Sequence, residues 1–594
     1  MPNVRFSEAV TSFYVDTALR VSRTVHVSQD NDLQAVPSTL VHPGDRLLFA
    51  DFAQQVLTNF PATQITSLRD VEELHMEKNA IHNIPEEIKF LRNLKVLYLN
   101  DNCIDSLCEE LGELTTLVRL DLSNNPIGCS NSIEVISALH NIQELRLYNT
   151  QLEEFPAEFC KKLIHLELLG LSGNKLRSLP KEIINLVKLK EIYLQKNKFE
   201  SFPLELCQLS ELEVLDMEGN SLRVLPKEIA CLQKLEKLYL AFNRLQSLPN
   251  SLSSCEQLIV LDVAGNSLQD LPQSIAQLAY LKELGLSHND LRVFPLQLCK
   301  VTSLQVLYLQ NTGIKTMPSN FINLGKIQFL DLSQNCLHYF PAEICSLLNL
   351  QMLSLDDNRI HKIPAEVNKL ANLKVLGLTG NKLKAFPEQI CFLESLEKLY
   401  LGQDQGKKFA VVPENIGQLK NLKELYLENN SLEFLPATIK LLEKLEILDC
   451  QNNILKELPE SICELKGLQR LLLQYNQLTS LPKDLDRLQK LKVLILDDNP
   501  MSDPPVNICS QGIPAVWKYL QEKRLRHVKA TKIQAWWRGL MVRKGLGCFA
   551  RLQAELRKAR KEKQEKGKKG SAKGKKGKGS GKGQRPSAGK SKKK

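Results

Sequence analysis

The sequence lacks any run of 18 apolar residues, the length at which a segment becomes a candidate for crossing a membrane. Its opening stretch, MPNVRFSEAVTSFYVDTALR, also lacks the apolar core of a signal peptide. We therefore expect a chain that is neither secreted nor membrane-spanning. Its expected location is the cytoplasm, with association with the cytoskeleton or the cilium left open.

Signatures of catalysis and of cofactor binding are also missing. There is no G-x-x-x-x-G-K-[ST], G-x-S-x-G or H-E-x-x-H motif, no kinase signature and no C-x-x-C pair, and the ten histidines are scattered. The sequence predicts a protein that is not an enzyme, with no catalytic residues, no metal site and no cofactor.

Cysteine is present, but not in the pattern of a disulfide framework. Six of the 15 cysteines recur at one place in the repeat, four residues after its proline. We expect these six to be small buried apolar side chains in a reducing compartment. They are Cys160, Cys207, Cys299, Cys345, Cys391 and Cys463.

Acidic residues are absent from the last part of the chain. Residues 1–517 hold 50 basic and 63 acidic side chains, residues 518–565 hold 15 and 4, and residues 566–594 hold 13 and none. The formal net charge of +11 therefore describes an acidic body with a basic end. It does not indicate a nucleic-acid-binding protein.

Leucine dominates the body and recurs with a period of 23 residues. LEVLDMEGNSLRVLPKEIACL, from Leu212, aligns with LEKLYLAFNRLQSLPNSLSSC, from Leu235, in the pattern L-x-x-L-x-L-x-x-N-x-L-x-x-L-P-x-x-I. This is the pattern of a leucine-rich repeat. The chain holds 19 such repeats and a degenerate one that ends at Pro61.

One repeat cannot bury its own leucines, whereas stacked repeats bury them in a continuous core. We expect L-x-L to form a short strand and L-P-x-x-I to return along the outer face in extended or 3₁₀ conformation. The predicted fold is an α/β solenoid, a leucine-rich repeat horseshoe with a parallel β-sheet on its concave face. An α-helical segment and a disordered tail are expected to follow it.

An asparagine follows the strand in 16 repeats, and Thr150, Thr312 and Asp404 take its place in three. The asparagine amide can donate to and accept from backbone groups of the turn that would otherwise be buried and unpaired. Threonine and aspartate can serve only part of this role. We therefore expect these three repeats to be local soft points.

The repeat spacing divides the chain into five expected segments. These are an N-terminal segment over 1–48, the repeats over 49–510, a helical cap over 511–524, a basic helix over 525–565 and a Lys/Gly/Ser tail over 566–594. The interval from Asn125 is 25 residues and the one from Asp404 is 26, and both exceed the period. We expect tolerated bulges there, with a binding loop as the alternative.

The array and its cap resemble intracellular leucine-rich repeat proteins of the Ras-suppressor type, which share the L-P-x-x-I pattern. That resemblance implies a cytosolic horseshoe that binds proteins on its concave face.

The residue between the two strand leucines is expected to point into the concavity. Six tyrosines and five aspartates share this column. Aromatic side chains with a polar tip are common anchors at protein interfaces. The column predicts an acidic, aromatic groove that prefers a basic or mixed partner surface, with repeat drift as the alternative. The tyrosines singled out for partner binding are Tyr193, Tyr239, Tyr308, Tyr400 and Tyr426.

The stretch TKIQAWWRGLMVRKGL, residues 531–546, lies in a proline-free basic segment that is rich in helix formers. A basic amphipathic helix is typical of a membrane surface or of a calmodulin target. The spacing favours a calmodulin target, because it fits every position of the IQ motif. This motif is a helix that is bound by a lobe of calmodulin or of a calmodulin-like light chain. The motif positions are Ile533, Gln534, Arg538, Gly539, Arg543 and Leu546.

The resemblance to the IQ motif implies a role for each position. Ile533 would enter the apolar pocket of the lobe, and Gln534 would bond to its backbone. The two arginines would face acidic side chains, and the glycine would allow close approach. Trp537 and Leu540 lie on the same apolar side as Ile533, and Trp536 would shield its flank. The alternative is a basic helix that is simply exposed or packs through its tryptophans.

Leucine-rich repeats followed by one IQ motif resemble the leucine-rich repeat and IQ domain-containing protein family. The resemblance implies a non-enzymatic intracellular scaffold that holds an unidentified target protein and binds calmodulin. Two alternatives stay open: a cytoskeletal or axonemal component with a permanently bound light chain, and a regulatory subunit of a phosphatase or ligase complex. The tail is expected to be solvated, or attracted to an anionic surface, without specific nucleic-acid recognition.

Overall fold

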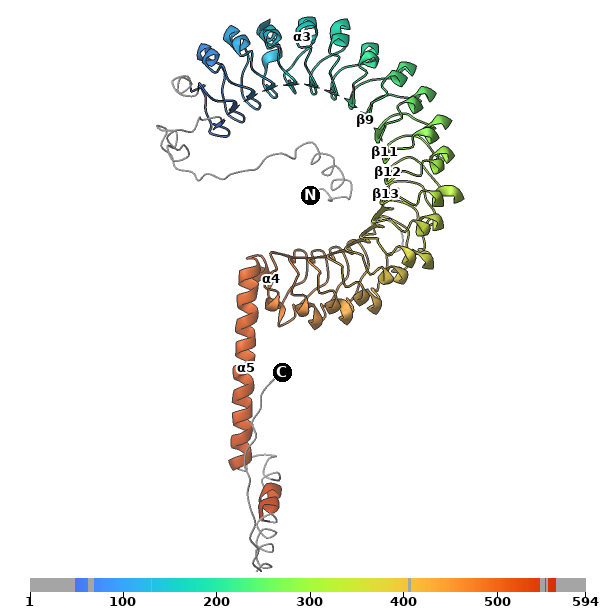
Figure 1. The fold of residues 1–594 in the computed structure, drawn as a ribbon. Coiled ribbons are helices and arrows are strands. Elements are labelled where there is room, and N and C mark those ends of the chain that lie inside the picture. Colours follow the sequence, from blue (N-terminus) through green and yellow to red (C-terminus); the bar gives the residue numbers. More distant parts are fainter. Residues whose placement is uncertain are drawn as a thin grey trace, which may run out of the picture. The chain divides into compact units, whose positions relative to one another are not determined.

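The computed structural model describes residues 49–61, 69–129, 131–403, 408–544, 551 and 554–561. The chain divides into two units, Met1–Ile513 and Pro514–Lys594, and the first contains every described strand (Figure 1). The predicted N-terminal segment 1–48, the tail 566–594 and Asp404 lie outside the described residues.

The first unit is built on one parallel sheet of 20 strands of three residues each, in which every strand pairs with the next one along the chain. Central residues face each other from strand to strand, as Leu238 faces Leu261. The strands are β1 Phe49–Asp51, β2 Glu73–His75, β3 Val96–Tyr98, β4 Arg119–Asp121, β5 Glu144–Arg146, β6 Leu168–Gly170, β7 Glu191–Tyr193, β8 Val214–Asp216, β9 Lys237–Tyr239, β10 Val260–Asp262, β11 Glu283–Gly285, β12 Val306–Tyr308, β13 Phe329–Asp331, β14 Met352–Ser354, β15 Val375–Gly377, β16 Lys398–Tyr400, β17 Glu424–Tyr426, β18 Ile447–Asp449, β19 Arg470–Leu472 and β20 Val493–Ile495.

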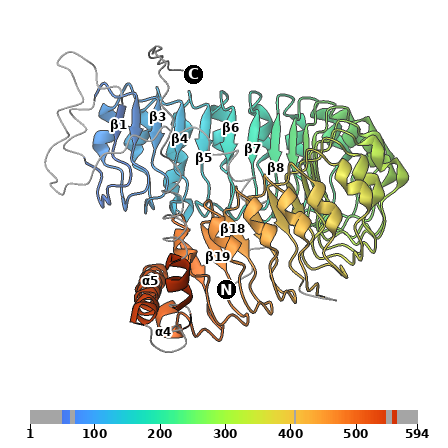
Figure 2. The ribbon, with the colours of Figure 1, turned by 90° about the horizontal axis from the view of Figure 1, so that it is seen from below.

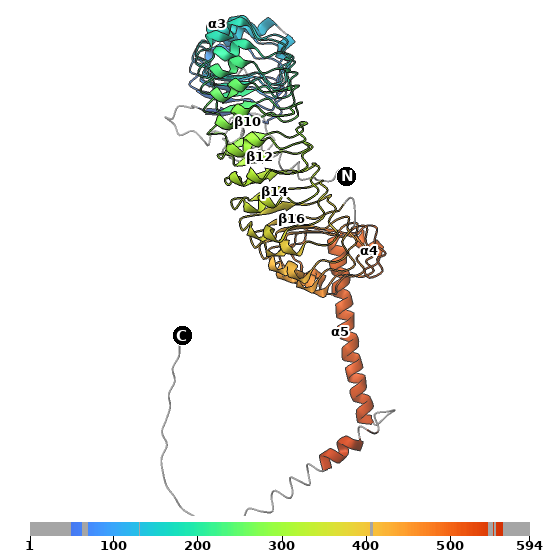
Figure 3. The same ribbon diagram turned by 90° about the vertical axis from the view of Figure 1, so that its right-hand side faces the viewer.

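This sheet confirms the predicted leucine-rich repeat solenoid. It lines the inner side of an arc, with short helices on the outer side (Figure 1). Figure 2 shows strands β3–β8 side by side, and Figure 3 follows the succession from β10 to β16.

The outer elements begin after the proline of L-P-x-x-I, as expected. Pro226, for example, is the extended N-cap of η7 and has no N–H that would need a partner there. Most of these elements are 3₁₀ turns: η1 Glu86–Phe90, η2 Glu109–Glu113, η3 Ile127–Cys129, η4 Asn131–Ala138, η5 Lys181–Asn185, η6 Leu204–Gln208, η7 Lys227–Cys231, η8 Asn250–Ser254, η9 Gln273–Gln277, η10 Leu296–Lys300, η11 Ser319–Asn323, η12 Ala342–Ser346, η13 Ala365–Lys369, η14 Glu388–Phe392, η15 Glu414–Gln418, η16 Ala437–Leu441, η17 Glu460–Glu464 and η18 Leu485–Arg487. Two are α-helices, α3 Ala157–Lys162 and α4 Val506–Cys509.

Between the sheet and these turns lies a continuous apolar core. Leu215, Leu222 and Ile229 of one repeat are 0% exposed, and the same positions are buried in its neighbours. The six cysteines that follow a proline are all buried, which confirms their predicted place in this core. The extra residues after Asn125 are accommodated by η3 and η4 on the outer side.

The repeat asparagines form a second, polar ladder inside the core. The Asn220 Nδ2 donates to the carbonyl oxygens of Met217 in its own repeat and of Leu194 in the preceding one, each at 3.0 Å. Its Oδ1 accepts the Phe199 N–H at 3.1 Å. Asn220 thus ties two repeats together through buried backbone groups, which confirms the predicted role of the asparagine.

Threonine reproduces part of this arrangement. The Thr150 hydroxyl donates to the Leu147 carbonyl at 3.0 Å, and the Thr312 hydroxyl donates to the Leu309 carbonyl at the same distance. Both bonds stay within one repeat. Among the described residues, neither threonine hydroxyl bonds to a carbonyl of the preceding repeat as Asn220 does, which is expected from the shorter side chain.

The residue before each asparagine takes a left-handed backbone conformation in most repeats, a feature that the sequence pattern did not disclose. Gly265 has a φ of +63°, and Phe242, one repeat earlier, has a φ of 53°. The available signal was the frequency of Gly, Asn and Asp at this position, because these residues tolerate left-handed φ values best.

Gly265→Ala is expected to destabilise the first unit by about 1–2 kcal/mol, since the left-handed conformation penalises a Cβ atom. That Cβ would also lie 2.5 Å from the Phe242 Cδ1. Chemical denaturation of the full chain checks the prediction. The matched control is Gly325→Ala, whose added Cβ meets nothing within 4 Å and should leave stability nearly unchanged. Equal effects of the two changes would contradict the prediction.

The second unit contains one long helix, α5 Ile513–Lys544, of 32 residues. It runs without a break from the expected cap into the expected basic segment. Val516 and Leu520 are its buried residues. No helix in the described part of the chain combines the length and the apolar character needed to cross a membrane.

Candidate functional site

The five predicted tyrosines point into the concavity, as expected from their place between two leucines. Tyr193 is partly exposed, while Ile192 and Leu194 on either side of it are buried. The Tyr193 hydroxyl donates to a Glu191 carboxylate oxygen at 2.7 Å, and Tyr426 donates to Glu424 at 3.1 Å. In four of the five, burial raises the pKa of the tyrosine far above its ordinary value, so these hydroxyls stay protonated. The four are Tyr193, Tyr239, Tyr400 and Tyr426.

Two of these tyrosines form an aromatic platform. The rings of Tyr400 and Tyr426, on adjacent strands β16 and β17, stack at 4.7 Å with an angle of 7° between their planes. Tyr308 packs instead on Phe329 of the next strand, with ring centroids 4.8 Å apart. The sheet therefore groups into pairs side chains that are a full repeat apart in the sequence.

Carboxylates alternate with the tyrosines in the same column. Asp216 and Asp262 flank Tyr239 on β8 and β10, and each accepts the backbone N–H of the residue two positions later at 3.0 Å. Burial raises the pKa of Asp216 to about 7 and that of Asp262 to about 6. No described Lys or Arg nitrogen lies within 4.0 Å of either carboxylate.

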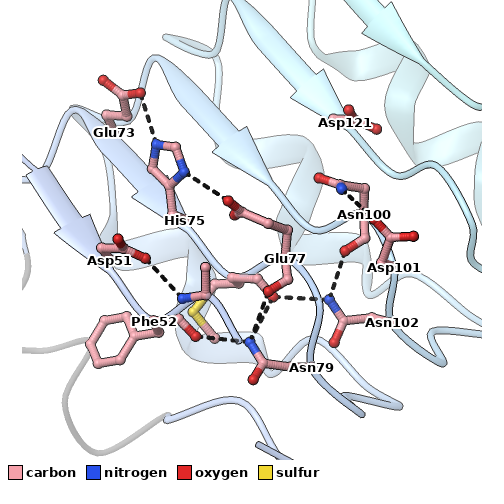
Figure 4. Close-up of polar contacts among 12 residues, drawn as sticks. Asp51, Phe52, Glu73, His75, Glu77, Asn79, Asn100, Asp101, Asn102 and Asp121 are labelled. Carbon is pink, nitrogen blue, oxygen red and sulfur yellow. Dashed lines mark hydrogen bonds and ion pairs between the residues drawn. The ribbon is translucent and has the colours of Figure 1, made fainter. Parts of the chain in front are cut away.

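At the start of the sheet, His75 lies between two carboxylates of its own segment (Figure 4). The His75 Nε2 lies 2.9 Å from Glu73, and the Nδ1 lies 3.2 Å from Glu77. Burial lowers the pKa of His75, but the hydrogen bonds to Glu77 and Glu73 outweigh this and raise it to about 9. The imidazolium is therefore charged at neutral pH and its charge is balanced on both sides.

The next strands carry a second balanced cluster. Arg146 on β5 pairs with Glu144 of the same strand and lies 3.9 Å from Asp121 on β4. The Arg119 Nε lies 3.2 Å from the other Glu144 oxygen. Toward the far end of the sheet, Lys398 lies 2.8 Å from Glu424. The charges of these residues are thus paired within the concave face.

A feature missed from the sequence is the column one residue before the strand's central leucine. Charged and apolar residues are mixed along this column, but four consecutive strands, β12–β15, all carry an apolar residue there. Val306, Phe329 and Met352 are partly exposed there, and Val375 is just buried. The sequence already contained this signal, because the apolar residues stand two positions before the residue that lies between the two strand leucines.

The second candidate site lies on α5. Ile533, Trp536 and Trp537 are 64%, 59% and 54% exposed. At 100° per residue, Ile533, Trp537 and Leu540 fall on one side of the helix, and Trp536 lies at its flank. Large apolar side chains that gather on an exposed surface mark an interaction site.

The polar positions of the motif lie around this apolar side. Gln534 and Arg538 are exposed, and the Arg543 Nε donates to the Gly539 carbonyl at 3.1 Å. A Cβ at Gly539 would meet only the Arg543 guanidinium within 4 Å, so the helix surface there is open to a close approach. The last predicted position, Leu546, lies outside the described residues.

Family models match most of these elements. A leucine rich repeat model matches residues 57–127, 140–199, 188–245, 233–291 and 443–501, and a leucine-rich repeat region model matches 328–431. An IQ calmodulin-binding motif model matches residues 527–546. The matched models describe repeats and a binding motif, and none describes a catalytic domain.

Curated relatives join the two features in one chain. The sequence is 50% identical over 189 residues to human "Leucine-rich repeat and IQ domain-containing protein 4", covering 32% of each chain. It is 51% identical over 165 residues to the mouse protein of that name, covering 28% of this chain and 27% of the mouse one. The matched segment thus spans about a third of the length of these relatives.

Among solved structures, a leucine-rich repeat protein of Leptospira interrogans superposes with a TM-score of 0.52 at 33% sequence identity. The superposition covers 74% of this chain and 99% of that protein.

Proposed function

The chain belongs to the leucine-rich repeat proteins that carry an IQ motif, and we propose that it is a non-enzymatic scaffold with two binding sites. Helix α5 binds calmodulin or a calmodulin-like light chain through the motif residues, and the concave face of the repeats binds a second protein. The free thiols of the 13 cysteines recorded in the described residues favour a reducing compartment, so we place this function in the cytoplasm.

The observation that carries the proposal is the exposure of Ile533, Trp536 and Trp537 on a continuous helix at the spacing of the motif. Burying one large apolar side chain in a partner contributes about 1.5–3 kcal/mol. The basic residues around them complement an acidic protein, and they also oppose self-association of the helix. Both properties suit an acidic lobe with an apolar pocket.

Titration calorimetry of calmodulin into the full chain, with Ca²⁺ and with a chelator, tests the first site. In the double variant Ile533→Ala, Arg538→Ala we expect binding to weaken by about a hundredfold, because the loss of a buried isoleucine and of a paired arginine costs about 3 kcal/mol. Affinity that survives the chelator would indicate a permanently bound light chain, as in a cytoskeletal or axonemal component.

The matched control is Leu525→Ala, Arg526→Ala, which removes the same residue types from exposed positions of the same helix outside the matched motif. It should bind calmodulin like the unaltered chain. Absence of binding in both conditions, or an equal loss in both double variants, would refute the assignment of the motif residues.

A further inference from the structure

The concave face differs along its length in how its charges are compensated. The clusters at Glu73, His75 and Glu77 and at Arg119, Glu144 and Arg146 pair their charges internally, as do Lys398 and Glu424. Between them, Asp216 and Asp262 have no described Lys or Arg within 4.0 Å. A cation from outside the described chain would meet no competitor there.

The surroundings of these two carboxylates fit a basic side chain. Each carboxylate accepts one backbone N–H through its Oδ1, so its Oδ2 is available for a charged donor. Tyr239 lies between them on β9, and among the described residues its hydroxyl has no hydrogen-bond partner. Two carboxylates and an aromatic ring are the groups that bind a guanidinium or an ammonium most strongly.

Next to this acidic site lies the apolar column of β12–β14. Val306, Phe329 and Met352 keep part of their surface exposed, and Tyr308 packs against Phe329 at their edge. Figure 3 shows the strands β10, β12 and β14 in close succession along the sheet. One strand, β11, separates the two kinds of surface on the same sheet.

Building on the proposed function of the concave face, we propose that strands β8–β14 bind an extended segment of a partner protein that carries a lysine or arginine and, farther along, apolar side chains. The basic residue pairs with Asp216 and Asp262 over Tyr239. The apolar side chains cover Val306, Phe329 and Met352.

The geometry also predicts the spacing within the segment. The basic site is centred on β9 and the apolar column on β12–β14, three to five strands away. With strands about 4.8 Å apart and about 3.3 Å per extended residue, the basic and apolar residues are separated by about four to seven positions. The basic tail of this chain has no apolar residue larger than alanine or proline and does not meet this requirement.

A phage-displayed library of random short peptides, selected on the full chain, tests the proposal. We expect enriched peptides to contain a basic residue at this distance from apolar ones. Fluorescence anisotropy with one enriched peptide then measures the variants. Asp216→Asn with Asp262→Asn, and separately Met352→Lys, are each expected to weaken binding at least about tenfold.

Two matched controls lie in the same columns of β18, beyond the proposed surface. Asp449→Asn replaces a buried carboxylate that also accepts a backbone N–H, and Ile447→Lys adds a lysine at a partly exposed apolar position. Each should change affinity by less than about twofold. Thermal unfolding of every variant checks that the repeats are intact.

Several outcomes would overturn the proposal. These are the absence of enriched peptides, enrichment of peptides without a basic residue, and equal losses in the β18 controls. If a peptide of residues 525–550 displaced the enriched peptide and bound with equal affinity, the surface would be assigned to this chain's own helix and not to a partner. Calmodulin titration is independent of these variants, so failure here leaves the α5 assignment of the proposed function standing.

Discussion

Replacing Asn220 by alanine is expected to lower the free energy of unfolding by about 3 kcal/mol, because it leaves the Phe199 N–H buried without a partner and removes one of the two amide donors to the Leu194 carbonyl. Among the bonds that it removes, those to Phe199 at 3.1 Å and to Leu194 at 3.0 Å join two repeats. Each repeat is stabilised largely by its neighbours, so the interface between these two repeats should open first. Hydrogen exchange of the Phe199 amide, together with a denaturant titration, measures both effects.

Two further variants sharpen this test. Asn220→Thr should cost less, since the threonines at 150 and 312 keep the bond to the carbonyl three residues earlier. Asn323→Ala removes an exposed asparagine of η11 and should change stability by no more than about 0.5 kcal/mol. If Asn220→Ala and Asn323→Ala gave the same denaturation midpoint, the asparagine ladder would not be a source of stability.

Asp216→Asn is expected to stabilise the protein at alkaline pH. Burial raises the pKa of Asp216 from its ordinary value of 3.8 to about 7. The folded state therefore binds this proton more tightly than the unfolded state does. The stability from this group is fully present below pH 3.8 and is lost as the pH rises through about 7. Asparagine keeps an acceptor for the Glu218 N–H but has no charge to bury.

Thermal and chemical denaturation across pH measure this effect. Between about pH 5.5 and 8 the unaltered chain should lose roughly 2 kcal/mol through Asp216, and Asp216→Asn should remove that part of the pH dependence. Asp70→Asn, at an exposed carboxyl, is the matched control and should leave the profile unchanged. If the free energy of unfolding depended on pH in the same way for the unaltered chain and for Asp216→Asn, ionisation of Asp216 would not destabilise the folded state.

Much of this molecule follows from local periodicity. A leucine at each central strand position can be buried only if the repeats stack, so the spacing around Leu215 and Leu238 leads directly to the parallel sheet and its register. The proline and isoleucine positions likewise place the outer turns, as at Pro226 and Ile229. On α5, the period of the helix alone brings Ile533 and Trp537 to one side.

The pairing of side chains from different repeats could not be read in the same way. The pattern identifies the column that contains Tyr239 and the aspartates. It does not show which aspartates have a basic neighbour, because that neighbour comes from a strand a whole repeat away in the sequence. Arg146 reaches Asp121 on the adjacent strand, whereas Asp216 finds no described cation within reach. The left-handed turn at Phe242 is equally hidden, because a phenylalanine is a poor signal for positive φ.

The sequence by itself determined the repeat, the strand register, the buried asparagines and the motif on the C-terminal helix, because each depends on residues within one or two periods of chain. Only the tertiary structure decided which carboxylates are balanced and which have no described Lys or Arg within reach. It also showed that an apolar column lies beside them. The physical reason is that electrostatic compensation acts through space, over distances that the folded sheet sets and the repeat period does not.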